Sequence, residues 1–460
     1  MAALASRKVI ALPAGVQEPS GAPELTLGIV SDVHLDARPG DEIWLRKALV
    51  YFRDHGADGV VIAGDMANLG RIVEFRQVVD TWYEVFPDDK APDGRHVEKL
   101  FCYGNHECIR DPRHASADGS PVWLSQDWSR HWKEIMHEDF HPVFTKNVKG
   151  YDFVLAHYPM GRKIAGEFLT RECPKLDTSK PFFFIQHEHP KDTCYGPWAG
   201  GHDDGRTTRA LSAYPNAIAL SGHSHYPLTD ERGIWQDSFT SIGTSTLHHI
   251  AEVYALIDNA YPTGNRLGYT GWKRPSRMLP INGYREGKQG MLMRVYADHV
   301  RIERRCFRYD LPLGDDWVFP VGKAAERPYA FARVREKRVA PEFAKDARIA
   351  TKVLAQTTGA FDGVEVSFPA AKPVNGCRVW KYEVQTVLVE DDSDIVIGTR
   401  QILAPGYFLP VEKEDRPGVL VIPPEDFPPK AHVRFEVRPV ECFGRKGASL
   451  VSEVVATEKA

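Results

Sequence analysis

Long apolar runs are missing from this 460-residue chain. A membrane-spanning helix needs about 20 consecutive apolar residues, and the sequence has no stretch of that kind. A short apolar segment near the N-terminus, residues 9–12, is followed by Pro13 and Gly15, and it is short for the apolar region of an export signal. We therefore expect no membrane span and a cytoplasmic location, with export after removal of a trimmed signal as the open alternative.

Paired cysteines and a surplus of basic residues are also missing. The seven cysteines are scattered, odd in number and without a C-x-x-C motif, so no disulfide framework is expected. The formal net charge is -4, whereas a protein that binds nucleic acid usually carries a basic surface. We therefore expect no nucleic acid partner.

The sequence does contain five apolar runs that end in side chains able to bind a metal. The runs and the residues that follow them are 25–30 with Asp32 and His34, 59–63 with Asp65, 100–103 with Asn105, 182–186 with His187 and His189, and 217–220 with His223 and His225. Each run is typical of a buried strand. Open α/β sheets bind ligands beyond the carboxyl ends of their strands, so these side chains are expected to converge on one crevice. The pattern predicts a two-metal site.

As a set, these motifs resemble the signature of the calcineurin-like metallophosphoesterase family. They are D-x-H at 32–34, G-D at 64–65, G-N-H-E at 104–107, a lone histidine, and G-H-x-H at 222–225. The resemblance implies an α/β fold of four layers, in which two mixed sheets pack face to face and helices flank them. It also implies two divalent or trivalent metal ions and hydrolysis of a small phosphomonoester or phosphodiester. Asp, Asn and His suit Mn, Fe, Zn and Co alike, so the metal stays open.

The resemblance also assigns a role to each residue of the motifs. Carried over by motif, Asp32, His34 and His225 hold one ion, Asn105, His187 and His223 hold the other, and Asp65 bridges both. A hydroxide between the ions would attack phosphorus. His106 would stabilise the transition state or protonate the leaving group, and the alternative is that it only orients a ligand. The expected protein is thus a metal-dependent hydrolase, and the alternative is a binding or scaffolding protein that has kept the fold and lost turnover.

Two departures from subgroup patterns narrow the resemblance. Purple acid phosphatases carry a tyrosine three residues after the bridging aspartate, where this chain has Asn68, and they use D-x-G where this chain has D-x-H. Protein phosphatases of the superfamily carry G-D-x-V-D-R-G, and residues 64–70 lack its second aspartate and its arginine. Both subgroups are disfavoured.

Several histidines outside the assigned set remain open. His187 follows its apolar run directly and is favoured as the metal ligand, while His189 is expected to line the substrate crevice. His202 lies in a loop rich in glycine, 193–205, where substrate contact and ordinary loop chemistry are both open. His157 is expected to be structural. His248 and His249 are not expected to bind metal, because adjacent residues of a strand point to opposite faces.

The chain is long enough for more than one domain, and its patterns change along its length. We expect a flexible arm at 1–24, the catalytic domain at 25–311 and a linker at 312–345. Residues 346–460 contain short alternating strands, as at 364–368, 380–384 and 433–437, with a turn signal at Asn375-Gly376. In this pattern they resemble a fibronectin type III-like domain, an all-β sandwich of immunoglobulin-like type. Within the catalytic domain we expect helices at 41–55 and 72–86, and strands at 239–242, 291–295 and 300–303 that close the second sheet.

Overall fold

The computed structural model describes residues 21–117, 120–194, 203–250, 288–322, 326–391 and 393–457. No helix within these ranges is long and apolar enough to cross a membrane. All seven cysteines are free, and Cys102 is a buried residue between the sheets. The expected arm lies mostly outside the described residues, and the first strand begins at Leu25.

The first sheet has seven strands in the order β12-β11-β10-β1-β2-β3, and β13 pairs with β11. The strands are β1 (Leu25–Val30), β2 (Gly59–Ala63), β3 (Glu98–Cys102), β10 (Gln289–Val295), β11 (His299–Cys306), β12 (Leu311–Pro312) and β13 (Trp317–Pro320). Strands β1, β2 and β3 are parallel, whereas β10 runs antiparallel to β1. The sheet is therefore mixed.

The second sheet has six strands in the order β4-β5-β6-β7-β9-β8. The strands are β4 (Val143–Val148), β5 (Tyr151–Ala156), β6 (Phe182–Gln186), β7 (Ala217–Ser221), β8 (Ile234–Gln236) and β9 (Thr240–Gly243). Strands β5, β6, β7 and β9 are parallel, and β4 and β8 are antiparallel at the edges. This sheet is mixed as well.

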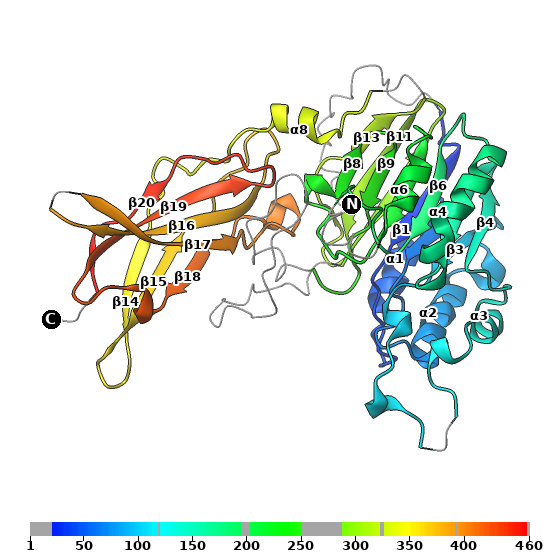
Figure 1. Cartoon of the computed structure of the whole chain (residues 1–460), viewed down its shortest axis with the longest axis horizontal. Coiled ribbons are helices and arrows are strands. Elements are labelled where there is room, and N and C mark those ends of the chain that lie inside the picture. Colours follow the sequence, from blue (N-terminus) through cyan, green and yellow to red (C-terminus); the bar gives the residue numbers. More distant parts are fainter. Residues whose placement is uncertain are drawn as a thin grey trace, which may run out of the picture.

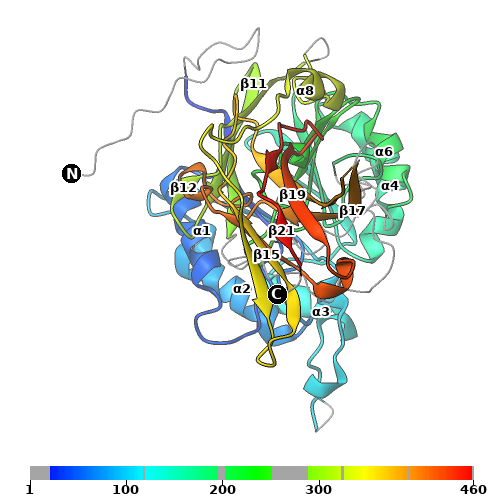
Figure 2. The same cartoon turned by 90° about the vertical axis from the view of Figure 1, so that its left-hand side faces the viewer.

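The two sheets pack face to face, and helices cover their outer faces. Alternate residues of β1, such as Leu27 and Ile29, lie between the sheets, while Val30 faces the helices, because side chains of a strand alternate between its two faces. Helices α1 (Ile43–Asp54), α2 (Ile72–Val85) and α3 (Trp128–Met136) cover the first sheet, and α4 (Met160–Glu172) and α6 (Arg206–Leu211) cover the second. Figure 2 shows the two helical layers on opposite flanks. The layered fold and the helices expected at 41–55 and 72–86 are confirmed.

Short 3₁₀ helices lie between these elements and in the C-terminal region. They are Pro87–Asp89, His106–Cys108, Pro112–His114, Leu124–Gln126, Cys173–Lys175, Glu231–Gly233, Val411–Lys413 and Pro424–Asp426.

Two expectations about this region need correction. Strands β10 and β11 do not close the second sheet, because β10 pairs with β1 and extends the first sheet instead. Only β9, from the expected 239–242 strand, lies in the second sheet. The stretch expected as a linker from 312 to 345 contains β13, which pairs with β11, and then α8 (Phe331–Lys337). The first sheet thus extends to Pro320.

The C-terminal region contains two further antiparallel sheets. One has the order β14-β15-β18 and the other β17-β16-β19-β20, with β21 paired to β19. The strands are β14 (Ala350–Ala355), β15 (Phe361–Phe368), β16 (Val379–Val389), β17 (Asp394–Leu403), β18 (Gly418–Ile422), β19 (His432–Glu441), β20 (Leu450–Val451) and β21 (Val455–Ala456). Apolar side chains from both sheets form one core, and Figure 1 shows the strands to one side of the α/β domain, beyond α8.

The C-terminal region and the α/β domain share buried polar contacts. Arg232, which is fully buried, pairs with Asp230 at 2.5 Å and donates to the carbonyl oxygen of Cys442 at 2.8 Å. Its guanidinium lies 4.4 Å from the centroid of the Trp380 ring. The core of the C-terminal sheets also includes Tyr226 of the α/β domain. A buried arginine needs its partners, so the two parts pack as one structure.

Candidate metal centre

The carboxyl ends of five strands meet at one place between the two sheets. Each of the strands β1, β2, β3, β6 and β7 ends one to three residues before the first motif residue that follows it. The predicted metal ligands therefore arrive from both sheets, as Asp32 and His34 after β1, Asp65 after β2, Asn105 after β3, His187 after β6, and His223 and His225 after β7. The convergence follows from parallel strands whose carboxyl ends lie at one edge.

The first group of donor atoms comes from Asp32, His34, Asp65 and His225, and one ligand atom from each lies within 4.8 Å of the others. Nε2 of His225 lies 2.9 Å from Oδ1 of Asp32 and 3.1 Å from Nε2 of His34. Nε2 of His34 lies 3.8 Å from a carboxylate oxygen of both Asp32 and Asp65. Two imidazole nitrogens and two carboxylates thus face one point.

The second group comes from Asp65, His187 and His223, with the same 4.8 Å limit. Nε2 of His187 lies 3.1 Å from Oδ2 of Asp65 and 2.9 Å from Oδ1 of Asn105. The rings of His187 and His223 have centroids 5.0 Å apart. Asp65 therefore belongs to both groups, which is the geometry that a bridging carboxylate requires.

Backbone carbonyls fix the tautomers of two of these imidazoles. Nδ1 of His187 donates to the carbonyl oxygen of Ala63 at 2.8 Å, and Nδ1 of His225 donates to that of His249 at 2.8 Å. These bonds place a proton on Nδ1 and leave Nε2, which faces the carboxylates, as the nitrogen that binds a metal once it has given up its own proton. Nδ1 of His34, by contrast, has no hydrogen-bond partner among the described residues.

The backbone of the site is strained in a consistent way. Asp32, His34, Asp65, His223 and His225 all have positive φ angles, between 48° and 66°. Such left-handed conformations are rare for residues other than glycine and cost about 1–3 kcal/mol each. The backbone conformation of these five residues therefore lowers the stability of the fold. Strain of this kind is concentrated at functional sites.

Two motif glycines are required by close packing against the ligands. A Cβ atom at Gly104 would lie 2.3 Å from Oδ1 of Asp65, and one at Gly222 would lie 2.4 Å from Oδ2 of Asp32. Real Cβ atoms do not approach this closely, so any side chain at either position would displace a carboxylate. The glycines of the G-N-H and G-H-x-H motifs thus have a steric explanation.

Glu107 connects two loops of the site through buried hydrogen bonds. Its fully buried carboxylate accepts hydrogen bonds from the backbone nitrogens of Gly104 at 2.5 Å, Ala67 at 2.7 Å and Asp65 at 3.2 Å. Burial and then the charge of Asp65 raise the pKa of Glu107 to about 8. One side chain therefore joins the loop after β2 to the loop after β3. Only the acidic position of the G-N-H-E motif hints at this in the sequence.

The charges of the site favour positive charge between the carboxylates. Burial opposes a charge on His187, but Asp65 overcomes it and raises the pKa of the imidazole to about 10. Burial likewise opposes a charge on His225, and Asp32 raises its pKa. Buried carboxylates that attract protons to neighbouring imidazoles also attract metal cations, and nitrogen and oxygen donors suit Mn, Fe, Zn and Co. The donor set thus fits a dinuclear metal site.

His106 lies at the open side of the donor groups. Its Nδ1 donates to the carbonyl oxygen of Asn68 at 2.6 Å, and its Nε2 lies 4.0 Å from Oδ2 of Asp65. The side chain keeps 30% of its surface exposed, whereas that of His187 keeps none. The ring packs edge-on against His34, with centroids 4.3 Å apart. His106 is therefore next to the donor groups and open to a substrate.

His189 does not line a crevice as expected. Its ring is fully buried, with Nε2 3.1 Å from Oγ of Ser224 and Nδ1 3.3 Å from Sγ of Cys194. Burial lowers its pKa to about 3. The alternation that places it on the same side as His187 ends with β6 at Gln186, so the chain turns before His189. His202, the other expected substrate contact, lies outside the described residues.

The remaining histidines have distinct places. His157 is fully buried and accepts a hydrogen bond from the backbone nitrogen of Tyr103 at 3.0 Å, and burial lowers its pKa to about 3, which fits the structural role expected for it. His248 and His249 follow β9 in irregular structure, so the argument from strand geometry does not apply to them. Their ring centroids lie 5.4 Å and 6.0 Å from that of His34.

The model of the calcineurin-like phosphoesterase family matches residues 25–227. A dimetal phosphatase from Danio rerio is 14% identical, with 64% of this chain and 98% of that chain covered and a TM-score of 0.37. A conserved uncharacterized protein and predicted phosphoesterase from Streptococcus pneumoniae is 12% identical (65% and 98% covered, TM-score 0.25). Vacuolar protein sorting 29 from Cryptosporidium parvum is 10% identical (65% and 98% covered, TM-score 0.29). No curated protein matches the chain significantly.

Proposed function

Because residues 25–227 form a calcineurin-like phosphoesterase domain, we propose that the protein is a dinuclear metal-dependent hydrolase of a small phosphomonoester or phosphodiester. One observation carries the proposal: two groups of converging donor atoms share the carboxylate of Asp65. A single metal site would not need a shared carboxylate, and a protein without metal would gain nothing from five strained residues around it.

We assign a metal-binding role to each motif residue from its place in the two donor groups. Asp32, His34 and His225 would hold one ion, Asn105, His187 and His223 the other, and Asp65 both. Two such ions, when bound, supply positive charge that binds the phosphoryl oxygens and activates water. Glu107 holds the two loops that carry Asp65 and Asn105 at a fixed separation through its backbone hydrogen bonds.

His106 would act on the substrate directly. Its Nδ1–H is held by the carbonyl oxygen of Asn68, and its Nε2 lies 4.0 Å from Oδ2 of Asp65 on a side chain that keeps 30% of its surface exposed. In the imidazolium form, Nε2–H can donate a proton to the oxygen of the departing alcohol. The carbonyl of Asn68 also orients the ring, so the proton is delivered from a fixed direction.

We propose in addition that the C-terminal sheets form a fibronectin type III-like domain. The support is their division into β14-β15-β18 and β17-β16-β19-β20 around one core.

The net charge of -4 supports a small phosphoester over a nucleic acid as substrate.

The test compares two aspartates at opposite ends of β2. Asp65→Asn should lose at least one of two bound ions and nearly all phosphoesterase activity, because amide and carboxylate differ in charge and in bridging ability. Asp58→Asn is the matched control, since Asp58 is also buried but lies before β2 and accepts from the backbone nitrogen of Thr26. Ions per chain are counted by elemental analysis, and turnover is measured on 4-nitrophenyl phosphate and bis(4-nitrophenyl) phosphate. Wild-type metal content and turnover in Asp65→Asn would refute the proposal.

A further inference from the structure

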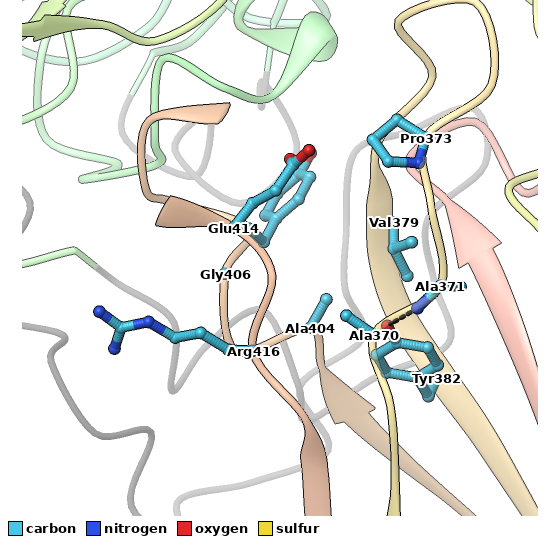
Figure 3. Close-up of a pocket in the computed structure, with 10 residues that line it drawn as sticks. Ala370, Ala371, Pro373, Val379, Tyr382, Ala404, Gly406, Glu414 and Arg416 are labelled. Carbon is cyan, nitrogen blue, oxygen red and sulfur yellow. Dashed lines mark hydrogen bonds between the residues drawn. The ribbon is translucent and has the colours of Figure 1, made fainter. Parts of the chain in front are cut away.

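A cavity opens beside the metal-binding residues, on the side of the first donor group. It has a volume of about 160 Å³, and His34 forms part of its wall. A smaller cavity of about 20 Å³ lies among the C-terminal strands, between Ala404, Tyr382 and Glu414 (Figure 3). The smaller one has room for about one water molecule, whereas the larger one can hold a ring.

The wall of the larger cavity combines one flat apolar surface with hydrogen-bonding groups. Its lining residues include the aromatic Trp44, the acidic Asp36 and Asp41, and the nitrogen-bearing Lys288 and His248. Asp36 already accepts from the side-chain amide of Asn68 at 2.6 Å, but an ionised carboxylate has about four acceptor sites. The wall can therefore accept several hydrogen bonds from a ligand.

Two lysine side chains lie near the indole of Trp44, which packs partly buried against the core. Nζ of Lys288 lies 6.0 Å and Nζ of Lys47 lies 5.8 Å from the centroid of the Trp44 ring. Lys47 is itself paired with Asp310 at 2.8 Å, and Lys288 donates to the carbonyl oxygen of His248 at 2.9 Å. Trp44 therefore lines the same cavity as His34, which belongs to the first donor group.

We propose that this cavity is the subsite for the alcohol part of the substrate, and that this part is a hydroxyl-bearing ring, as in a sugar phosphate or the ribose of a nucleotide. A phosphoester whose phosphorus lies at the donor groups has its alcohol part directly beside His34. The C–H face of a sugar ring packs on the indole, and its hydroxyls donate to Asp36 and Asp41. A long apolar chain would leave these carboxylates desolvated and unpaired, at a considerable cost. The inference rests on the proposed function, because it assigns the substrate of that same site.

The experiment measures selectivity in the full-length, metal-loaded protein. The values of kcat/KM are determined for ribose 5-phosphate, glucose 6-phosphate and adenosine monophosphate, and each is divided by the value for methyl phosphate, which has no ring. Trp44→Ala and Asp41→Asn should each lower at least one of these ratios by about 10-fold or more. Trp44→Phe should recover most of the selectivity, since it restores a ring surface. The metal content of every variant is counted alongside.

Trp128→Ala is the matched control, because Trp128 also packs half-buried against the core beneath the first sheet but does not line the cavity. It should leave every ratio unchanged. A preference for adenosine monophosphate over ribose 5-phosphate identifies a nucleotide, and the reverse identifies a sugar phosphate.

Equal loss on ringed and ringless substrates in Trp44→Ala, or wild-type ratios near one, would overturn the subsite while leaving the hydrolase intact. A wild-type protein that hydrolyses no phosphoester, 4-nitrophenyl phosphate included, would overturn the proposed function and the subsite with it.

Discussion

The two histidines that follow β6 allow a sharp test of the metal centre, because they are two residues apart and only one faces the donor groups. His187 offers Nε2 to Asp65 and Asn105, whereas both ring nitrogens of His189 face Ser224 and Cys194 instead. We predict that His187→Ala loses one ion of two and that His189→Ala keeps both.

The size of the effect follows from the geometry. Loss of a group that only orients a ligand lowers metal affinity by about 10- to 100-fold. His187 is itself a donor, so its removal should weaken the second ion by more than about 100-fold, or about 2.7 kcal/mol. His189→Ala should instead lower the stability of the fold, by about 2–4 kcal/mol, because it leaves a cavity and an unpaired hydroxyl on Ser224.

Metal content is counted by elemental analysis after dialysis at a fixed concentration of free metal, and circular dichroism verifies that each variant is folded. Added imidazole should restore the second ion to His187→Ala, because it can enter the space left by the ring, and should have no such effect on His189→Ala. An ion lost from His189→Ala and retained by His187→Ala would refute the assignment of donors.

Two further predictions concern single histidines. His106→Ala should keep both ions and lose roughly 10²–10⁴-fold in kcat, the usual contribution of a general acid, and loss of an ion instead would make His106 a support for a ligand. His157 has a folded pKa of about 3 and an unfolded value near 6.5, so the unfolded chain alone takes up a proton as the pH falls through this window. The wild type should lose on the order of 4 kcal/mol of stability between pH 6.5 and 3 from this residue. His157→Asn, whose amide oxygen can accept from the backbone nitrogen of Tyr103, should lack that share of the loss in urea unfolding across the same range, and an identical pH dependence in both proteins would contradict the reasoning.

The sequence predicts the local elements and the order of the motifs well, because both depend on short-range patterns. The apolar stripe of α2 and the buried runs of the parallel strands are visible as periods along the chain. The motif residues need only a strand end beneath them, and the structure brings one such residue after another to the same edge. The glycines at 104 and 222 belong to the same short-range signal.

Contacts between distant segments account for the rest. Nothing within β10 distinguishes a place beside β1 from a place in the second sheet, since an apolar strand suits either and the pairing partner is more than 260 residues away. The sequence predicts a substrate contact for His189, but in the structure its two ring nitrogens face Ser224 and Cys194. The sequence shows Glu107 only as the acidic position of a motif, and it does not predict the hydrogen bonds by which Glu107 joins two loops.

The C-terminal region, which the sequence presents as a separate unit, also makes buried contacts with the α/β domain. Gln289, fully buried at the start of β10, donates to the carbonyl oxygen of Phe408 at 2.7 Å and accepts from Oγ of Ser245 at 3.2 Å. The carbonyl oxygen of Ser245 lies 2.8 Å from Oγ of Ser31, which in turn lies 2.5 Å from the carboxylate of Asp32. A series of close, buried polar contacts therefore runs from the C-terminal region to a carboxylate of the first donor group, and the single hydroxyl proton of Ser31 is donated either to Ser245 or to Asp32. Displacement of the C-terminal region would leave the buried side-chain amide of Gln289 without the carbonyl oxygen of Phe408, so the loop between β17 and β18 helps to hold Gln289 in place beside Ser245.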